Sequence, residues 1–308
     1  MSPISPSLGA AAGHADGRPA KMRAFEGMLA VPALLLVIAA LVVPTGWFFA
    51  QSFVGADGHL SLENYSRIVE SPAYYRTFLT TFQLSAVTVL VCVLVGTPLA
   101  FVMATARGRP AALLFLAILL PFWTALLVRT YTWLVVLQRF GLVNSFLMWT
   151  GLTSEPLPLI NNFAGTVVGM VHIMLPVFVL PTYAAMKQMD VNVVRAALSL
   201  GASRTRTFFG VILPLSASGI LAGTVLVFVT TLGFFVTPAI LGGGNVTVVS
   251  MRIEKNISSF SNWGAASSLG VVLLAMVAAA LAVGYWAVAR SGLREVVKVL
   301  AGKGMVEM

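Results

Sequence analysis

The most constraining feature of this sequence is its long stretches without Asp, Glu, Lys or Arg. Six of them occur in the 308-residue chain, and each holds an apolar block near the length of one membrane crossing. A hydrocarbon core about 30 Å thick takes about 20 apolar residues in a helix. The stretches cover residues 27–56, 77–106, 110–128, 156–186, 207–251 and 256–289. The chain is therefore expected to be an integral membrane protein.

Composition agrees with this, because only 9% of the residues are charged, against about 25% in an average soluble domain. Continuous apolar runs such as AVPALLLVIAALVV favour helices, since a barrel strand alternates apolar and polar residues. We predict an all-α membrane protein with six transmembrane helices. Their approximate cores are residues 28–50, 79–104, 111–137, 163–186, 211–238 and 264–289.

The distribution of Lys and Arg predicts the orientation. With the N-terminus in the cytoplasm, 13 of the 19 basic residues fall on the cytoplasmic side, so both termini are expected there. The net charge of +9 then reflects topology, and it is not evidence for nucleic-acid binding. We divide the chain into a cytoplasmic, disordered tail over 1–24, a transmembrane domain over 25–290 and a cytoplasmic tail over 291–308. Cys92 is the only cysteine, so no disulfide is expected.

Two ionisable residues lie inside the predicted spans. Arg129 stands in the third span and His172 near the middle of the fourth, and such groups are costly in a membrane and often functional. Arg129 is equally compatible with a side chain that reaches the outer surface. A neutral His172 that hydrogen-bonds to a neighbouring helix is more common than a relay. Both residues remain candidates for a translocation path, together with the aromatic Phe234 and Phe235.

The segment between the fourth and fifth spans differs from its surroundings. Asp190 or Asn192 can cap a short helix, and Gly201 suits a left-handed residue at its end. Ser203 can cap a second helix that leads back into the bilayer. Periodicity alone leaves two interpretations open: a membrane-surface helix whose basic residues pair with anionic lipid, or a cytoplasmic helix-turn-helix that docks into a soluble partner.

The residues RAALSLGASRTRTFFGVILPLSASGI resemble the signature of the permease subunits of ABC importers. In that family Glu-Ala-Ala is followed by Leu-Gly-Ala, a Phe, Leu-Pro and Gly-Ile. Ten residues match this pattern: Ala196, Ala197, Leu200, Gly201, Ala202, Phe208, Leu213, Pro214, Gly219 and Ile220. Two residues depart from it, since Arg195 replaces the usual Glu and Ser218 a common Pro.

Other segments extend the resemblance over about residues 28 to 290. LPFWTALLVRTYTW, FFVTPAILGGGNVTVVSMRIE and NWGAASSLGVVLL are similar to the first permease of spermidine/putrescine-type importers. The resemblance implies a type I importer permease fold in the inner membrane, with a coupling segment over 190–206. The residues that it implies for contact with the ATPase are Arg195, Ala196, Ala197, Leu198, Ser199, Leu200, Gly201, Ala202, Ser203 and Arg204.

The resemblance also implies the partners. They are a cytoplasmic ATPase dimer, a second permease subunit and an extracytoplasmic solute-binding protein. The solute is then a polyamine, or a related solute such as an opine or a phosphonate. ATP is expected to bind to the ATPase, and this chain is expected to need no cofactor or metal of its own.

The residues themselves give little support to other functions. The chain contains no G-x-x-x-x-G-K-S/T motif, and all ten acidic residues fall outside the predicted spans. We therefore expect no enzyme activity. The main alternative is an ion-coupled secondary transporter that uses His172, although the chain lacks the intramembrane carboxylates and the clear internal repeat usual in that class.

Overall fold

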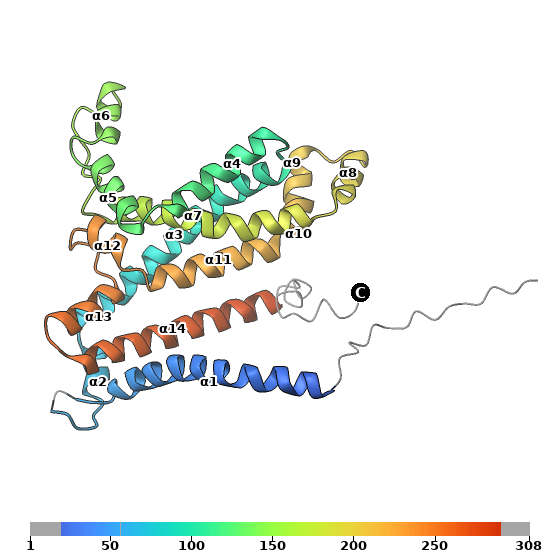
Figure 1. The fold of residues 1–308 in the computed structure, drawn as a ribbon. Coiled ribbons are helices and arrows are strands. Elements are labelled where there is room, and N and C mark those ends of the chain that lie inside the picture. The colour runs from blue at the N-terminus through green and yellow to red at the C-terminus, as the bar shows by residue number, and fades with distance from the viewer. Residues whose placement is uncertain (1–19, 56, 291–308) are drawn as a thin grey trace, which may run out of the picture. The chain divides into compact units, whose positions relative to one another are not determined.

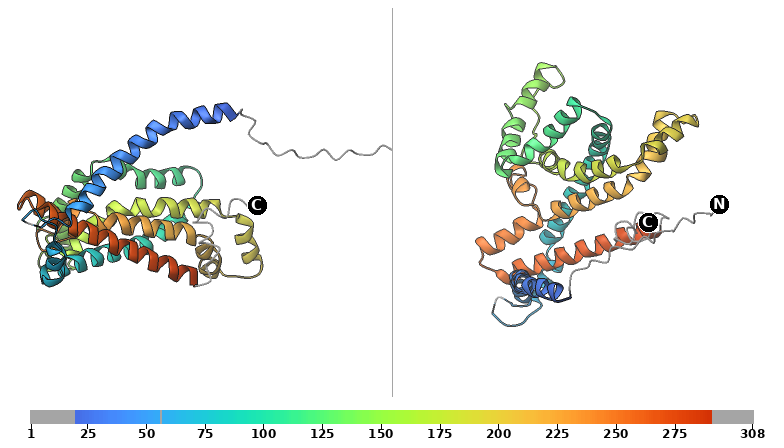
Figure 2. Two further views of the ribbon diagram at one scale, coloured as in Figure 1. Left: turned by 90° about the horizontal axis from the view of Figure 1, so that it is seen from below. Right: turned by 45° about the vertical axis from the view of Figure 1, so that its right-hand side comes forward.

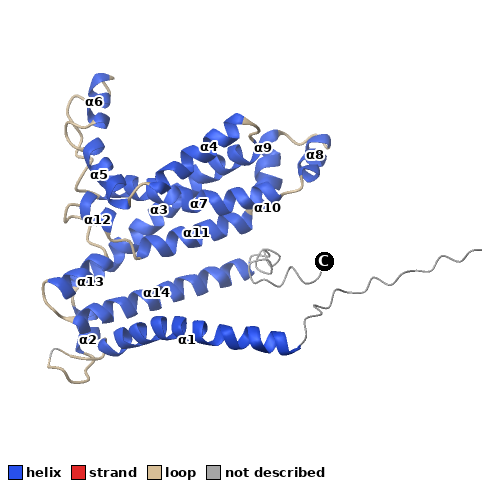
Figure 3. Cartoon of the chain, in the orientation of Figure 1, coloured by secondary structure: helices blue, strands red, loops and turns tan. Residues whose placement is uncertain are grey.

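The computed structural model describes residues 20–55 and 57–290 (Figure 1). Helices dominate this part of the chain, and it contains no strand apart from an isolated bridge between Val54 and Leu60 (Figure 3). The chain divides into two compact units, residues 1–50 and 51–308. The tails predicted over 1–24 and 291–308 lie outside the described residues, except for 20–24, which begin helix α1.

Helix α1 (Ala20–Gln51) accounts for the described part of the first unit. Its 32 residues include Pro32 and Pro44. The helix continues through both prolines, which membrane helices tolerate better than soluble ones. The segment Leu34–Gln51 is long and apolar enough to cross a membrane, in agreement with the first predicted span.

Three helices form the centre of the second unit: α3 (Pro72–Thr105), α7 (Phe163–Gln188) and α11 (Ala217–Leu232). They lie side by side in all three views (Figures 1 and 2). The Phe178 side chain of α7 is fully buried between its neighbours. The predicted second, fourth and sixth spans are confirmed by α3, α7 and α14 (Trp263–Arg290), which all pass the length and hydropathy test for membrane helices.

Glycines allow these helices to approach closely. A Cβ atom on Gly223 of α11 would lie 2.8 Å from the backbone oxygen of Phe178. A Cβ atom on Gly219 would lie 2.6 Å from the backbone oxygen of Pro181. On α3, a side chain at Gly96 would collide with the Phe178 ring. The small-xxx-small pair at Gly219 and Gly223 therefore packs α11 against α7, as such pairs do in membranes.

The prediction of a continuous third span over 111–137 is wrong. Helix α4 (Arg109–Leu119) runs into a 3₁₀ turn, η1 (Leu120–Trp123), and α5 (Leu126–Leu137) starts only after two extended residues, Thr124 and Ala125. Pro121 explains the interruption, because it has no N–H to donate within a helix. The apolar segment of spanning length here is Leu126–Trp149, which includes α6 (Leu142–Trp149), and Arg109–Trp123 is shorter.

The fifth predicted span, 211–238, is also interrupted. A bend of 65° separates Arg204–Leu215 from α11, and the two parts together form one candidate span. The first part consists of α9 (Arg204–Thr207), the π-helix η2 (Phe208–Ile212) and α10 (Leu213–Leu215). Beyond α11 the chain leaves the helix at Gly233 and enters the short α12 (Val236–Leu241).

Three further helices complete the described chain. They are α2 (Glu63–Glu70), α8 (Val191–Ser199) and α13 (Val249–Ser258). Helix α2 lies between the first two spans. Its Asn64 side chain is buried and donates to the Val54 carbonyl oxygen at 2.8 Å. Figure 1 places α8 at one end of the second unit and α5, α12 and α13 at the other.

The contact between α7 and α11 gives a testable consequence. Gly223→Val would force carbon atoms against the Phe178 backbone, which cannot move without separating the two helices. We expect the free energy of unfolding to fall by about 1–3 kcal/mol, as for other overpacked cores. Thermal unfolding in detergent would measure it. The matched control is Gly284→Val on α14, where a Cβ atom would meet nothing within 4 Å. Equal losses in both variants would contradict this account of the packing.

Candidate coupling and translocation sites

The segment 190–206 projects from the central helices as two short helices. The last residue of α7, Gln188, is followed almost directly by α8, and α9 then leads through η2 and α10 into α11. The segment is thus joined at both ends to the two helices that pack through Gly219 and Gly223. Figure 1 shows α8 and α9 beyond the ends of α7 and α11. Any displacement of the segment therefore acts directly on the central helices.

Local hydrogen bonds explain the shape of this segment. The Asp190 carboxylate accepts the backbone N–H of Asn192 at 2.9 Å, so Asp190 is the residue that caps α8. Gly201 has φ +86°, the left-handed conformation expected at the end of this helix. The Ser203 hydroxyl oxygen accepts the backbone N–H of Arg206 at 3.2 Å and caps α9. The local prediction from the sequence is confirmed in each of these details.

The outward surface of the segment is both apolar and basic. Helix α8 has no buried residue, and Val194 and Ala197 are the half-buried ones that face the body of the protein. Leu198 and Leu200 are exposed, Leu200 with 88% of its surface accessible. The remaining predicted contact residues lie on the same surface or in the turn that follows α8. Ala202 is half-buried, and the others are exposed: Arg195, Ala196, Ser199, Ser203 and Arg204.

Aromatic contacts hold the base of the segment against α3. The ring of Phe208 in η2 meets the ring of Phe101 edge-on, with the centroids 5.1 Å apart. Phe208 makes a second edge contact with Phe209, at 5.2 Å. On the α7 side, the Lys187 ammonium donates to the Ala104 carbonyl oxygen near the end of α3, at 3.3 Å. The segment is thus fixed to three helices at its base.

The structure brings together two of the four predicted path residues. Helix α5 carries Arg129 one turn before Trp133, and the Trp133 ring contacts His172 of α7. The Cζ atom of Arg129 lies 5.9 Å from the centre of the Phe122 ring, and the His172 ring meets Trp133 edge-on with centroids 5.6 Å apart. The Arg129 Nε and Nη1 atoms and His172 Nδ1 are buried and have no hydrogen-bond partner among the described residues.

The other two path residues occupy the break after α11. Phe234 is half-buried and packs against two clusters of buried apolar side chains, one around Phe178 and one around Met170. Phe235 is exposed. The Ser250 hydroxyl donates to the Phe234 carbonyl oxygen at 2.8 Å and occupies this backbone oxygen. In the described chain no hydrogen bond or ring contact joins either phenylalanine to Arg129 or His172. Helix α5, which carries Arg129, does meet α12, which follows Phe235, because the hydroxyl oxygens of Thr130 in α5 and Thr237 in α12 lie 3.4 Å apart.

Sequence reasoning missed the aromatic surroundings of this pair. Trp133 is half-buried, and its ring meets the His172 ring edge-on. The spacing of Arg129 and Trp133 could have indicated that the two side chains are neighbours, because residues four apart on a helix lie on one face. Phe122 lies beyond the break in the helix, so no periodicity relates it to Arg129.

The fold and the segment together define a class of protein. The described chain is a bundle of apolar helices with an exposed helix-turn-helix at one end, as expected for a membrane protein. A family model for binding-protein-dependent transport system inner membrane components matches residues 96–292. The chain belongs to this family, and it is a permease subunit of a binding-protein-dependent ABC importer.

Individual relatives agree with the family. The chain is 33% identical to the spermidine/putrescine transport system permease protein PotB of Haemophilus influenzae, over 77% of this chain and 86% of that one. It is 31% identical to PotB of Escherichia coli, over 75% and 83%. A bacterial alginate ABC transporter, solved in complex with an alginate pentasaccharide-bound periplasmic protein, has a similar fold. Its chain matches with a TM-score of 0.72 at 14% identity, over 88% of this chain and 96% of that one. The ion-coupled alternative gains no support from these comparisons.

The turn at Gly201 gives a testable prediction about ATP-driven uptake. Gly201→Pro would remove the N–H that bonds to the Leu198 carbonyl oxygen at 3.0 Å, and proline cannot adopt φ +86°. We expect ATP-driven uptake in proteoliposomes to fall by about tenfold or more. Gly201→Asn is the matched control, because asparagine tolerates the left-handed region. Wild-type uptake by the proline variant would contradict a role for this turn.

Proposed function

We propose that this chain and a second permease subunit form the translocation path of an importer driven by a cytoplasmic ATPase dimer. Residues Arg195 to Arg204 are the contact with the ATPase. The observation that carries this proposal is the exposed, apolar and basic surface of a segment fixed at both ends to the central helices. An extracytoplasmic binding protein delivers the solute, in keeping with the family and with the periplasmic protein present in the alginate transporter complex.

The proposal fixes the orientation of the chain in the inner membrane. The coupling segment and both termini face the cytoplasm, and α5, α12 and α13 face outward. The excess of Lys and Arg on the cytoplasmic side supports this orientation. ATP is bound and hydrolysed by the partner ATPase, and this chain takes no catalytic step. It has no cofactor of its own.

In this proposal, movement of the ATPase reaches the membrane helices through the two ends of the coupling segment. Closure of the ATPase dimer moves α8 and α9, and this motion reaches α7 and α11 together because the two helices are packed through glycines. The aromatic contact between Phe208 and Phe101 passes the same motion to α3. The π-helix η2 and the bend before α11 supply the places where the backbone can adjust, since π-helical turns are frequent at functional sites.

We place the translocation path beside the break between α4 and α5. Arg129, His172, Phe234 and Phe235 belong to it in this proposal. The unpaired nitrogens of Arg129 support its inclusion, because buried Nε and Nη1 atoms without an acceptor are costly and call for a functional reason. The backbone leaves the helical conformation at Thr124–Ala125 and at Gly233–Phe235, and irregular backbone at membrane depth occurs where it is buried in protein or lines a water-filled cavity.

The solute in this proposal is a polyamine, or a related solute such as an opine or a phosphonate. The names of the relatives support the polyamine class, since both PotB proteins belong to spermidine/putrescine systems. An aromatic side chain such as Tyr131 offers a face that attracts an ammonium group. The described spans contribute no carboxylate, so selection among these solutes rests mainly with the binding protein.

The proposed function is tested by reconstitution with its partners. The tagged chain is purified in mild detergent with the subunits that accompany it, and the complex is placed in proteoliposomes with the binding protein outside. We expect uptake of labelled spermidine or putrescine only when ATP is enclosed, and no effect of a protonophore. Uptake driven by a proton gradient without ATP would overturn the ABC mechanism for this chain. Uptake of an opine or a phosphonate instead would correct the solute alone.

Arg129 allows a separate test of the path. Arg129→Ala is expected to lower ATP-driven uptake by about tenfold, which corresponds to about 1.4 kcal/mol in the barrier. Arg129→Lys keeps the charge but not the planar guanidinium, and we expect intermediate uptake. Arg139→Ala is the control, because Arg139 is exposed on the loop after α5. Normal uptake with a lower yield of folded Arg129→Ala protein would assign this residue to structure and remove it from the path.

A further inference from the structure

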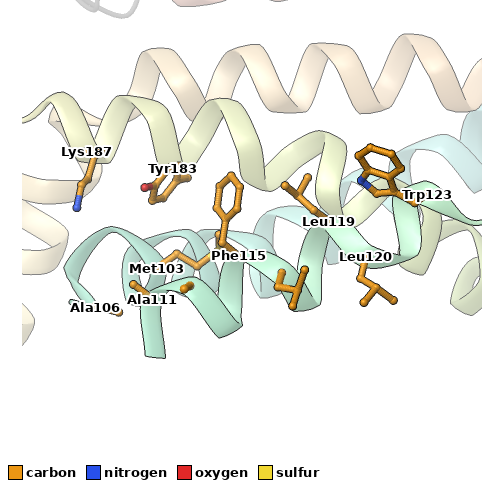
Figure 4. Close-up of a pocket in the computed structure, with 11 residues that line it drawn as sticks. Met103, Ala106, Ala111, Phe115, Leu119, Leu120, Trp123, Tyr183 and Lys187 are labelled. Atoms are coloured by element: carbon orange, nitrogen blue, oxygen red, sulfur yellow. The ribbon is translucent and has the colours of Figure 1, made fainter. Parts of the chain in front are cut away.

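A hollow of the described chain lies between α3, α4, η1 and α7. Its volume is about 970 Å³, and apolar side chains such as Phe115, Leu119 and Trp123 form most of its lining. Figure 4 shows Lys187 and Tyr183 at one end of this hollow and Trp123 at the other. One wall of the hollow is formed by the 11 residues of α4 and the 4 residues of η1. At rises of about 1.5 and 2.0 Å per residue this wall is roughly 24 Å long.

Charge is confined to one end of the hollow. Lys187 is the only charged residue in its lining, and a second hollow of about 380 Å³ shares Lys187 and adds Arg107. Arg109 starts α4 beside them. Within residues 100–125 and 180–210 the only carboxylate is Asp190, which already accepts the N–H of Asn192. This end of the hollow is therefore basic and has no acidic residue of the described chain to neutralise it.

The shape and the charge together select the occupant. A cationic solute would meet Lys187 at the entrance, and like charges there oppose its entry. An amphiphile with a negative head and an apolar tail complements both ends. One leaflet of hydrocarbon is about 15 Å thick, so a groove roughly 24 Å long can hold an acyl chain along its length. Basic pockets between membrane helices on the cytoplasmic side are suited to anionic lipid head groups.

We propose that this groove is a binding site for an anionic phospholipid of the cytoplasmic leaflet. The phosphate lies at Lys187 and Arg107, and an acyl chain lies along Phe115 and Leu119 toward Trp123. This placement rests on the proposed function, which puts the coupling segment and hence Lys187 in the cytoplasm. A lipid bound here would fill the gap between α4 and α7 next to the base of the coupling segment.

The test measures bound lipid on the intact complex. The complex is purified from native membranes, exchanged into nanodiscs that contain phosphatidylglycerol and phosphatidylcholine in equal parts, and extracted into mild detergent. Native mass spectrometry then counts the phosphatidylglycerol molecules retained. We expect the double variant Lys187→Gln, Arg107→Gln to retain phosphatidylglycerol with roughly 25-fold lower affinity, since each basic group contributes about fivefold. The control pair Arg139→Gln, Lys255→Gln removes two exposed charges at the other end of the unit.

A second variant keeps the proposal testable if the charge variant is unstable. Ala112→Phe places a ring in the groove from α4, and Ala278→Phe adds the same ring at an exposed position of α14. We expect lipid loss for Ala112→Phe only. Equal retention in all variants would overturn the proposal, as would a cross-link from position 112 to the second permease in place of lipid. Failure of ATP-driven uptake would refute the proposed function while leaving the lipid count unaffected.

Discussion

The close contact between α7 and α11 is the constraint on which the rest of the structure depends. Gly219 and Gly223 bring the α11 backbone against Pro181 and Phe178, so the two helices form one body. The coupling segment is simply the chain that connects these helices. Its position is therefore set by the best-packed part of the protein, although α8 itself has no buried residue.

The other end of the unit is organised around interruptions. The 3₁₀ turn that contains Pro121 ends at Trp123 before α5, and α11 stops at Leu232. These breaks place Arg129 beside His172, with aromatic rings around both. The helices α8 and α9 are capped at Asp190 and Ser203, although the π-helix η2 and a 65° bend follow them before α11. The opposite end contains irregular backbone and the unpaired buried nitrogens of Arg129 and His172.

The sequence was sufficient for much of this architecture. Hydropathy predicted four of the spans closely, because each consists of a single long helix. The caps at Asp190 and Ser203 and the left-handed Gly201 followed from local chemistry that no distant contact overrides. Hydropathy failed at the third and fifth spans, where an apolar run continues through a break in the helix. It also could not predict the contacts of Phe122 and Trp133, which depend on how α5 is turned against α7.

The central claim is that the coupling segment is the contact with an ATPase. The most direct measurement places a photo-cross-linking amino acid at Leu200, which is 88% exposed, and analyses the cross-linked products from intact membranes. The account predicts one main adduct with a subunit that hydrolyses ATP, and a yield that changes when nucleotide is added. Adducts with lipid alone would contradict it and would make α8 a membrane-surface helix.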